Sequence, residues 1–363
     1  MHRHPSAWLA PAMLVALAGC WPHAGWGQAR PAGAYEPPRT AWGDPDLQGM
    51  WPIDRLNGTP VQRPDAFGER RFLTDEEFAE RVDRLRALNA RYDEEIAANK
   101  MGTGHWAEMG EPNRLTSLIV EPANGRVPPL TPEGERRSAL MTSSWSDIPF
   151  DRVSDFNALD RCITRGMPAS MFPFMYNSGI EIMQAPGYVV IRLELVHETR
   201  VVPVDGRPPL SPDIVQWLGE SRGRFEGDTL VIETANFNGE TPMLIVGPGG
   251  KPIPTSVEMR IVERLTRVAE DTIDYEIAVS DPVTLTQPWK AAFPLMRDDD
   301  YRMFEYACHE DNSAIRNFIE TSRFERRQRT TASQCRNQVT PPNPPQTIAT
   351  ARSHGSRRRS ATR

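Results

Sequence analysis

The sequence predicts a mainly β protein, an antiparallel barrel or sandwich with one long amphipathic helix near its N-terminus. Between residues 180 and 310, short runs of alternating apolar and polar residues are separated by turn signals, which is typical of antiparallel strands. The 34 prolines among the 363 residues favour loops and strand edges over helical bundles. Because the runs are joined by short connections, the strands would follow one another as hairpins. This meander favours a closed barrel over a sandwich.

The clearest strand pair lies in residues 216–237 and turns at Gly227, within the sequence GRFEGDTLVIETANF. Glycine at the first of two loop positions is typical of a type II′ hairpin turn. On the outgoing strand, alternation places Leu230, Ile232 and Thr234 on one face of the sheet.

Seven further runs complete the predicted strands, and their bounds follow from alternation and from the turn residues between them. They cover residues 180–184, 188–195, 199–204, 257–268, 272–279, 284–296 and 301–310. One short strand within 113–122 precedes them, and a helix over 313–324 would close the fold.

A long amphipathic helix is predicted over residues 74–98. Thr74 and Glu77 have the spacing of a capping box at its start. Apolar residues then recur every three or four positions from Phe78 to Ile96, while the other faces carry arginines and acids. Such a narrow stripe is typical of a surface helix packed on the main domain. A helix that recruits a partner is the alternative.

The first residues predict export. Basic residues precede an apolar run over 8–18 that is too short to span a bilayer, as in a signal peptide. The run ends in Leu-Ala-Gly-Cys, which resembles the lipobox of bacterial lipoproteins and would make Cys20 the lipidated N-terminus. Ordinary cleavage after residue 29 is the alternative. Because Trp21 replaces the aspartate of an inner-membrane retention signal, we expect a periplasmic protein anchored to the outer membrane by its lipid alone.

These features predict four regions. They are a signal peptide (1–20, or 1–29), a flexible tether (21–43), a single β-rich domain (44–325) and a disordered tail (326–363). The tether and the tail are rich in Pro, Gly and polar residues, a composition that does not bury a core. The formal net charge of −6 argues against a nucleic-acid partner.

Beyond Cys20, the cysteines predict one disulfide. In an oxidising compartment we expect Cys162 to pair with Cys308, because Cys335 lies in the polar tail. No cysteine–histidine cluster has zinc spacing, so a structural zinc is not expected. Phosphate-loop, dinucleotide and haem motifs are also absent from the sequence, and we expect no organic cofactor.

Candidate chemistry lies in the last predicted strand. Alternation over 301–310 places Glu305 and His309 on one face and Cys308 on the other. A histidine–carboxylate pair can serve as general acid and base near neutral pH, with His197 as a helper. Two histidines and a carboxylate can also hold a metal. A hydrogen-bonded, purely structural His309 is the simplest interpretation.

Arginines and aromatic residues supply the candidate ligand contacts. Arg222 and Arg224 can bind a carboxylate or phosphate through bidentate hydrogen bonds, although ion pairs across the hairpin are the simpler account. The Met- and Phe-rich segment 167–176, which ends in Tyr176, would line the mouth of a hydrophobic cavity or form ordinary core. Two further aromatic residues on predicted strands, Tyr188 and Trp289, complete the set.

Nine blocks of the sequence carry a family resemblance: DPDLQGMW (44–51), 115–121, 125–132, 162–166, QAPGYVVI (184–191), 197–206, 219–231 with SRGRFEGDTLV, 281–289 and YACHEDN (306–312). They resemble a family of exported, periplasmic proteins of Gram-negative bacteria. The resemblance implies export, but it implies no particular reaction or catalytic residue. The chain differs from the family at Phe225, where tryptophan is common, and at Asp311, where glycine is common. Gly49-x-Trp51 is in addition similar to the opening of lipocalin-like barrels, where the indole closes one end of the core.

Together these features predict an exported, lipocalin-like β-barrel protein that binds a small, largely apolar molecule. The first alternative is a cofactor-independent hydrolase, lyase or isomerase that uses His309 and Glu305 as acid and base. The second is an envelope protein whose helix over 74–98 recruits a partner. Large side chains filling the interior would argue against both hypotheses that need a cavity there.

Overall fold

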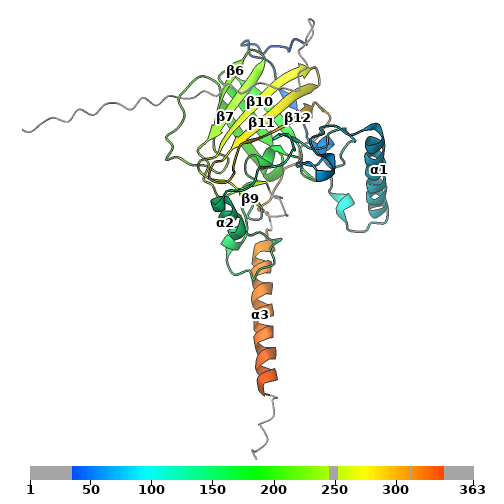
Figure 1. Cartoon of the computed structure of the whole chain (residues 1–363), viewed down its shortest axis with the longest axis vertical. Coiled ribbons are helices and arrows are strands. Elements are labelled where there is room, and N and C mark those ends of the chain that lie inside the picture. The colour runs from blue at the N-terminus through cyan, green and yellow to red at the C-terminus, as the bar shows by residue number, and fades with distance from the viewer. Residues whose placement is uncertain (1–34, 245–251, 311, 339–363) are drawn as a thin grey trace, which may run out of the picture. The chain divides into compact units, whose positions relative to one another are not determined.

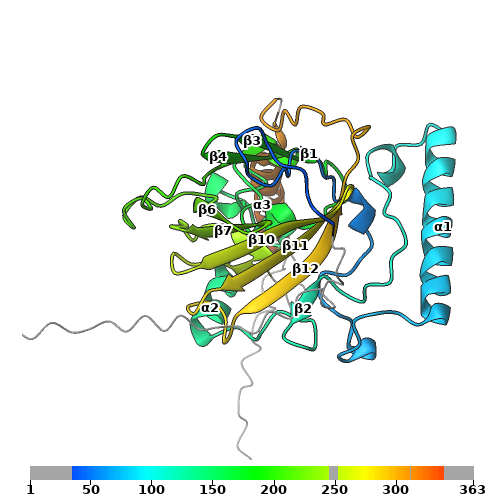
Figure 2. The same ribbon diagram turned by 90° about the horizontal axis from the view of Figure 1, so that it is seen from above.

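Two antiparallel sheets form the centre of the protein in the computed structural model, which describes residues 35–244, 252–310 and 312–338. The larger sheet has the strand order β2-β12-β11-β10-β7-β6 and the smaller has the order β1-β3-β4-β5 (Figures 1 and 2). The larger contains β2 (Ile119–Glu121), β6 (Glu220–Glu226), β7 (Thr229–Ala235), β10 (Arg260–Ala269), β11 (Thr272–Ser280) and β12 (Trp289–Met296). The smaller contains β1 (Gly49–Met50), β3 (Ile180–Ala185), β4 (Tyr188–Leu193) and β5 (Glu198–Pro203), and β8 (Pro242–Leu244) pairs with β9 (Ile253–Pro254).

Three α-helices accompany the described strands. The helix expected over 74–98 corresponds to α1 (Asp75–Ala97). At its start the Glu77 amide donates to Thr74 Oγ1 at 3.3 Å, and the Thr74 amide donates to Glu77 Oε2 at 2.8 Å, which completes the capping box. The other α-helices are α2 (Pro132–Leu140) and α3 (Ala314–Gln338). Short 3-10 turns lie at η1 (Asp54–Leu56), η2 (Asp65–Phe67), η3 (Thr103–His105), η4 (Val153–Asp155), η5 (Ala169–Met171) and η6 (Leu195–His197).

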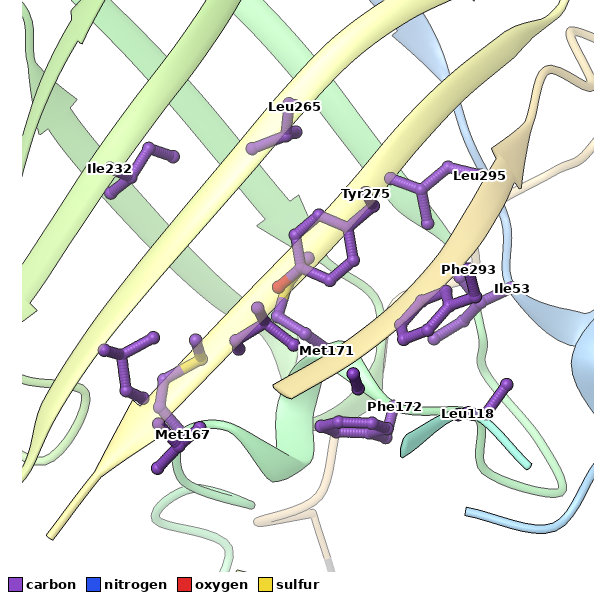
Figure 3. Close-up of a cluster of buried hydrophobic side chains, with 14 of the residues drawn as sticks. Ile53, Leu118, Met167, Met171, Phe172, Ile232, Leu265, Tyr275, Phe293 and Leu295 are labelled. Carbon is purple, nitrogen blue, oxygen red and sulfur yellow. The ribbon is translucent and has the colours of Figure 1, made fainter. Parts of the chain in front are cut away.

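The inner faces of the two sheets share one hydrophobic core (Figure 3). Alternation sends every second residue of each strand inward, as the buried residues of β11 illustrate. Tyr275, Phe293 and Phe172 pack together there, with ring centroids 5.2 Å apart for the first two and 5.7 Å apart for the last two. Met167 and Met171 are fully buried beside them. The space between the sheets is therefore occupied by large side chains.

The described strands do not close into a barrel, so the preference for a closed, lipocalin-like barrel is not confirmed. β5 and β6 approach closely, since a side chain at Gly223 would meet Val202 at 2.9 Å, but no backbone ladder joins these two strands. At the opposite edges β1 and β2 are only two and three residues long. The edge strands therefore share too few backbone hydrogen bonds to complete a ring. The two antiparallel sheets are compatible with a sandwich-like arrangement.

The prediction of a strand over residues 301–310 is wrong. Residues 297–308, which we call the strap, contain no strand. The backbone amides of the strap bond to other partners: Asp298 donates to the Met50 carbonyl at 3.0 Å, and Phe304 donates to the Glu194 carboxylate at 2.9 Å. The disulfide between Cys162 and Cys308, as predicted, fixes the end of the strap, with the two Cα atoms 5.5 Å apart.

The described residues divide into two compact units by their contacts. The first consists of the described residues up to Met141 together with those of Cys162–Cys308, and it contains both sheets, α1 and α2. The second consists of Thr142–Arg161 and the described residues from His309 onward, including α3.

The helix α3 continues well past the expected end at residue 324. Thr330 and Thr331 donate their hydroxyls to the carbonyls of Arg326 and Arg327, four residues back, as helical side chains can. Part of the predicted tail is thus helical. The signal peptide with Cys20, the first part of the tether, Asp311 and residues 339–363 lie outside the described residues. None of the described helices combines the length and apolar character needed to cross a membrane.

Candidate functional site

An apolar groove lies between α1 and neighbouring loops of the first unit, on the side of the strands where Figure 2 draws that helix. We call it the α1 groove. Its volume is about 340 Å³, which is within the range of small-molecule sites. Apolar and aromatic side chains dominate its lining, which comprises Leu56, Val61, Leu85, Leu88, Tyr92, Ala107, Met109, Pro173, Phe174 and Met175, with Asn57, Gly58, Thr59, Asn89, Glu108 and Gly110.

The helix presents one face to this groove. Leu85, Leu88, Asn89 and Tyr92 are spaced at three- and four-residue intervals, so they lie on the same side of α1. Leu85, Leu88 and Tyr92 belong to the apolar stripe seen in the sequence, and most of the stripe is only partly buried because the groove leaves it incompletely covered.

Two loops that are distant in sequence form the opposite wall. The Glu108 amide donates to the Met175 carbonyl at 2.8 Å, and the Asn57 side chain donates to the Glu108 carbonyl at 3.2 Å. At Gly110 a Cβ atom would lie 1.8 Å from the Asn57 carbonyl oxygen, so only glycine allows this approach. These contacts fix the wall before any ligand arrives.

Asn89, which lines the groove, has a polar atom without a described partner. Its Oδ1 is shielded from solvent, and no described residue donates a hydrogen bond to it. A buried acceptor without a partner costs about 1–3 kcal/mol. A bound molecule with an N–H or O–H group would remove that cost if Asn89 turned its amide toward the groove.

A second, smaller hollow adjoins the end of β4. Its volume is about 230 Å³, and it is lined by Arg192, Leu193, Glu194, His197, Met303, Phe304 and Glu305. The structure therefore brings two of the predicted catalytic residues, His197 and Glu305, to one hollow. Neither side chain hydrogen bonds to a described residue. His197 and the preceding Val196 both have φ of +61°, a conformation that is strained for a β-branched residue.

The third predicted catalytic residue, His309, does not line this hollow. It is exposed in the turn after Cys308 and belongs to the second unit. Its expected pairing with Glu305 relied on strand alternation over 301–310, and that strand is not formed.

Both arginines of the hairpin form ion pairs, but only one pair crosses between the strands as the simpler interpretation predicted. Arg224 lies 2.5 Å from Glu233 on the neighbouring strand β7 and 2.8 Å from Glu226 on its own strand. Arg222 pairs with Glu220, also on its own strand. The turn itself has φ of +62° at Gly227, as expected for a type II′ hairpin.

The aromatic candidates lie in three different places. Trp289 is buried in the core with its ring centroid 6.0 Å from that of Phe172, and its Nε1 lacks a described partner. Tyr188 accepts a hydrogen bond from Arg207 at 2.6 Å on the surface. Tyr176 packs edge-on against Phe174, a groove residue, at 4.8 Å.

The residues of the Met- and Phe-rich segment 167–176 lie partly in the core and partly along the groove. Met167, Met171 and Phe172 are core residues, and Phe174 and Met175 line the α1 groove. Sequence reasoning did not identify Asn89 or Glu108 as site residues. The only available signal was Asn89, a polar residue within the apolar face of the predicted helix.

Comparison with known proteins adds no identification. A scan of protein-family models, a search of curated proteins and a search of solved structures all gave no match. Within the described ranges, no group of three or more His, Cys, Asp or Glu side chains is arranged to hold a metal ion.

Proposed function

We propose that this protein binds a small, largely apolar molecule, and that the α1 groove holds it. The interior of the sheets, where the sequence predicted a cavity, carries large buried side chains such as Trp289, Tyr275 and Phe293. The groove instead offers an apolar lining and a suitable volume. These two properties carry the proposal. Asn89, which lines the groove, also has an oxygen to which no described residue donates a hydrogen bond.

The proposed ligand therefore has an apolar body and at least one hydrogen-bond donor. Leu85, Leu88 and Met109 would contact the body, and Asn89 would accept from the donor. Apolar walls with a few polar groups are the usual composition of such sites, in which the polar groups set the orientation of the ligand.

Filling the groove tests this proposal. The probe is N-phenyl-1-naphthylamine, an apolar secondary amine whose fluorescence rises on leaving water. Leu88→Trp should weaken its binding at least tenfold, and Asn89→Leu should weaken it by about three- to tenfold, the loss expected for one hydrogen bond. Ala87→Trp places the same side chain at an exposed position of the same helix and is the matched control.

Circular dichroism of each variant checks that α1 is intact. Equal probe binding by wild type, Leu88→Trp and Ala87→Trp would contradict a site in the α1 groove.

A second candidate function is acid–base catalysis in the hollow at the end of β4. The favouring observation is that His197 and Glu305, both without described partners, line that hollow beside a strained turn. The reaction would be a cofactor-independent hydrolysis, elimination or isomerisation. With p-nitrophenyl esters as substrates, His197→Ala should abolish turnover while folding is retained, and His309→Ala should leave turnover unchanged. Equal rates in all three proteins would exclude His197 as the base.

We further propose export to the periplasm with a lipid on Cys20, which rests on the sequence of the signal peptide. Mass spectrometry of the mature N-terminus tests it, and an unmodified N-terminus beginning near residue 30 would favour ordinary cleavage. A lipocalin-like relationship stays an analogy supported by the buried indole of Trp51. If the groove binds no small molecule, the partner-recruiting role of α1 becomes the leading hypothesis.

A further inference from the structure

Positive charge is concentrated at the C-terminal end of the chain. Residues 313–363 contain eleven arginines, no lysine and two glutamates, which gives them a formal charge of +9. Because the whole chain has a formal charge of −6, the residues before them carry −15. Such an asymmetry is typical of a chain whose basic end binds an anionic partner, either a membrane surface or a nucleic acid. Neither the α1 groove nor the hollow at the end of β4 uses this charge.

The helix α3 carries six of these arginines, and a loop of the second unit packs on its first half. Phe150 of this loop contacts Phe318 with ring centroids 5.4 Å apart, and Asp151 pairs with Arg326. The six described side chains that follow, from Arg327 to Ala332, are all exposed. Six consecutive residues of a helix point to every side of it, since one turn takes 3.6 residues. This part of α3 is therefore uncovered all round.

The second unit exposes aromatic side chains as well as basic ones. Arg316 and Arg327 are exposed on α3, and neither forms an ion pair with a described residue. Trp145 is 92% exposed and Phe324 is 54% exposed. Basic and aromatic residues exposed together are typical of segments that lie on a membrane surface. Because most of the stability of a helix comes from packing one of its faces, the uncovered part of α3 has a face available for a partner.

We propose that the second unit binds an anionic phospholipid surface through α3. Each arginine near such a surface strengthens binding by about fivefold. An indole such as that of Trp145 lies preferentially at the boundary between head groups and acyl chains. The choice of a membrane over a nucleic acid rests on the proposed export, because an exported protein meets phospholipid surfaces and leaves the nucleic acids of the cell behind.

This contact adds a second attachment to the anchor proposed at Cys20. Stable attachment of a lipidated protein to a membrane generally combines the acyl group with a further signal, such as a basic segment. The lipid lies at the start of the mature chain and α3 lies near its end. The two attachments therefore act on opposite ends of the sequence.

The experiment measures sedimentation of the mature chain with phospholipid vesicles. It uses the chain that begins at residue 30, the shorter of the two expected mature forms, because this form has no lipid of its own. Vesicles of phosphatidylcholine are compared with vesicles that also contain phosphatidylglycerol. At about 0.1 M salt, binding to the anionic vesicles should be at least about tenfold tighter, and it should weaken as salt is added.

Two double variants test whether α3 makes the contact. Arg316→Gln with Arg327→Gln removes two exposed charges from α3 and should weaken binding to the anionic vesicles about thirtyfold, at about fivefold for each arginine. The matched control is Arg84→Gln with Arg86→Gln, which removes two exposed charges from α1 and should leave the affinity unchanged. Glutamine favours the helix about as well as arginine does, and circular dichroism checks that the helices are retained.

Trp145→Gln tests the apolar part of the contact. It should weaken binding to the anionic vesicles about tenfold, and added salt should not remove this difference, because burial of apolar surface is not screened by ions. Trp106→Gln replaces an exposed indole of the first unit and should have no effect. Equal effects of the two tryptophan variants would overturn the assignment of the contact to the second unit.

Three further results would overturn the inference. They are equal affinity for the two kinds of vesicle, equal losses in the two arginine double variants, and tighter binding to a short DNA duplex than to anionic vesicles. The last result would identify a nucleic acid as the partner of α3. Failure of the proposed export is a separate outcome, because mass spectrometry of the N-terminus detects it and vesicle binding does not depend on it.

Discussion

Two polar clusters in the first unit, one buried and one partly buried, hold their carboxyl groups in different ways. Between the sheets, Arg200 on β5 meets Glu263 on β10, with Nη1 and Oε1 3.0 Å apart, and Tyr275 donates to the same carboxylate at 2.8 Å. Beside the α1 groove, Tyr301 joins Glu108 to Glu194 and no guanidinium takes part among the described residues. The first cluster balances a charge with an opposite charge, and the second surrounds its carboxyl groups with neutral hydrogen-bond donors.

The difference separates a cluster fixed by charge from one held by neutral donors. Arg200 and Glu263 are almost completely shielded from water, and an arginine keeps its charge at any physiological pH. That pair is therefore fixed. The second cluster depends instead on the strap, which supplies both the Tyr301 hydroxyl and the Phe304 amide.

The largest expected effect comes from freeing the strap that carries Tyr301. Replacing Cys162 and Cys308 together with serine opens a loop of 146 residues. In the chain-entropy account this should lower the free energy of unfolding by about 4–5 kcal/mol. Urea unfolding measures the loss. Hydrogen exchange should increase in the strap and not at Arg200, and equal increases at both places would contradict the separation of the clusters.

Removing one charge of the Arg200–Glu263 pair should lower the free energy of unfolding by nearly as much as removing the disulfide. Glu263→Ala leaves Arg200 buried without its partner, and breaking such a pair destabilises by about 3–5 kcal/mol. The double replacement Arg200→Met with Glu263→Leu removes both charges and should recover most of that loss. Thermal unfolding of the three proteins checks the order. A double variant no better than Glu263→Ala would mean that the pair contributes more than charge balance.

The two tyrosines allow a direct comparison of the clusters. Tyr275→Phe leaves Glu263 bonded to Arg200, so the loss should be about 1 kcal/mol. Tyr301→Phe leaves two carboxyl groups without the hydroxyl between them and should cost about 2–3 kcal/mol. Urea unfolding of the two variants measures both losses. Equal losses would contradict the difference between the clusters.

Asp54 should give the smallest effect. Burial raises its pKa, and its Oδ1 has no described partner. A raised pKa in the folded state favours the protonated form, so this group stabilises the fold below its unfolded value of about 3.9 and loses that contribution as the pH rises. Asp54→Asn should therefore gain about 0.5 kcal/mol at pH 7 and nothing at pH 3. Unfolding curves at the two pH values test the sign.

The sequence predicted the elements whose pattern is local. The alternation in β10 and β11 set strand bounds within a few residues, and Thr74 with Glu77 set the start of α1. Residues 301–310 also alternate, but their backbone bonds to the Glu194 side chain instead of to a neighbouring strand. Alternation alone does not distinguish these two kinds of partner.

The candidate site could not be predicted from the sequence, for a related reason. Glu108 and Tyr301 are separated by 193 positions, and nothing near either residue signals the other. The α1 groove likewise joins segments around residues 57, 89, 108 and 174 that carry no common motif. His197 and Glu305 were identified as residue types, and their shared hollow follows only from the path of the strap.

The position of Cys308 has a consequence for the order in which the molecule is completed. It is the last residue of the first unit, and its partner Cys162 precedes nearly all of the strands. During synthesis from the N-terminus, the sheets can assemble before the strap emerges, but the crosslink and the contact of Tyr301 with Glu108 cannot form until it does. Tyr301 is thus the last member of its cluster to arrive. A chain truncated at residue 296 would retain the paired strands and both carboxyl groups but would lack the hydroxyl that joins them.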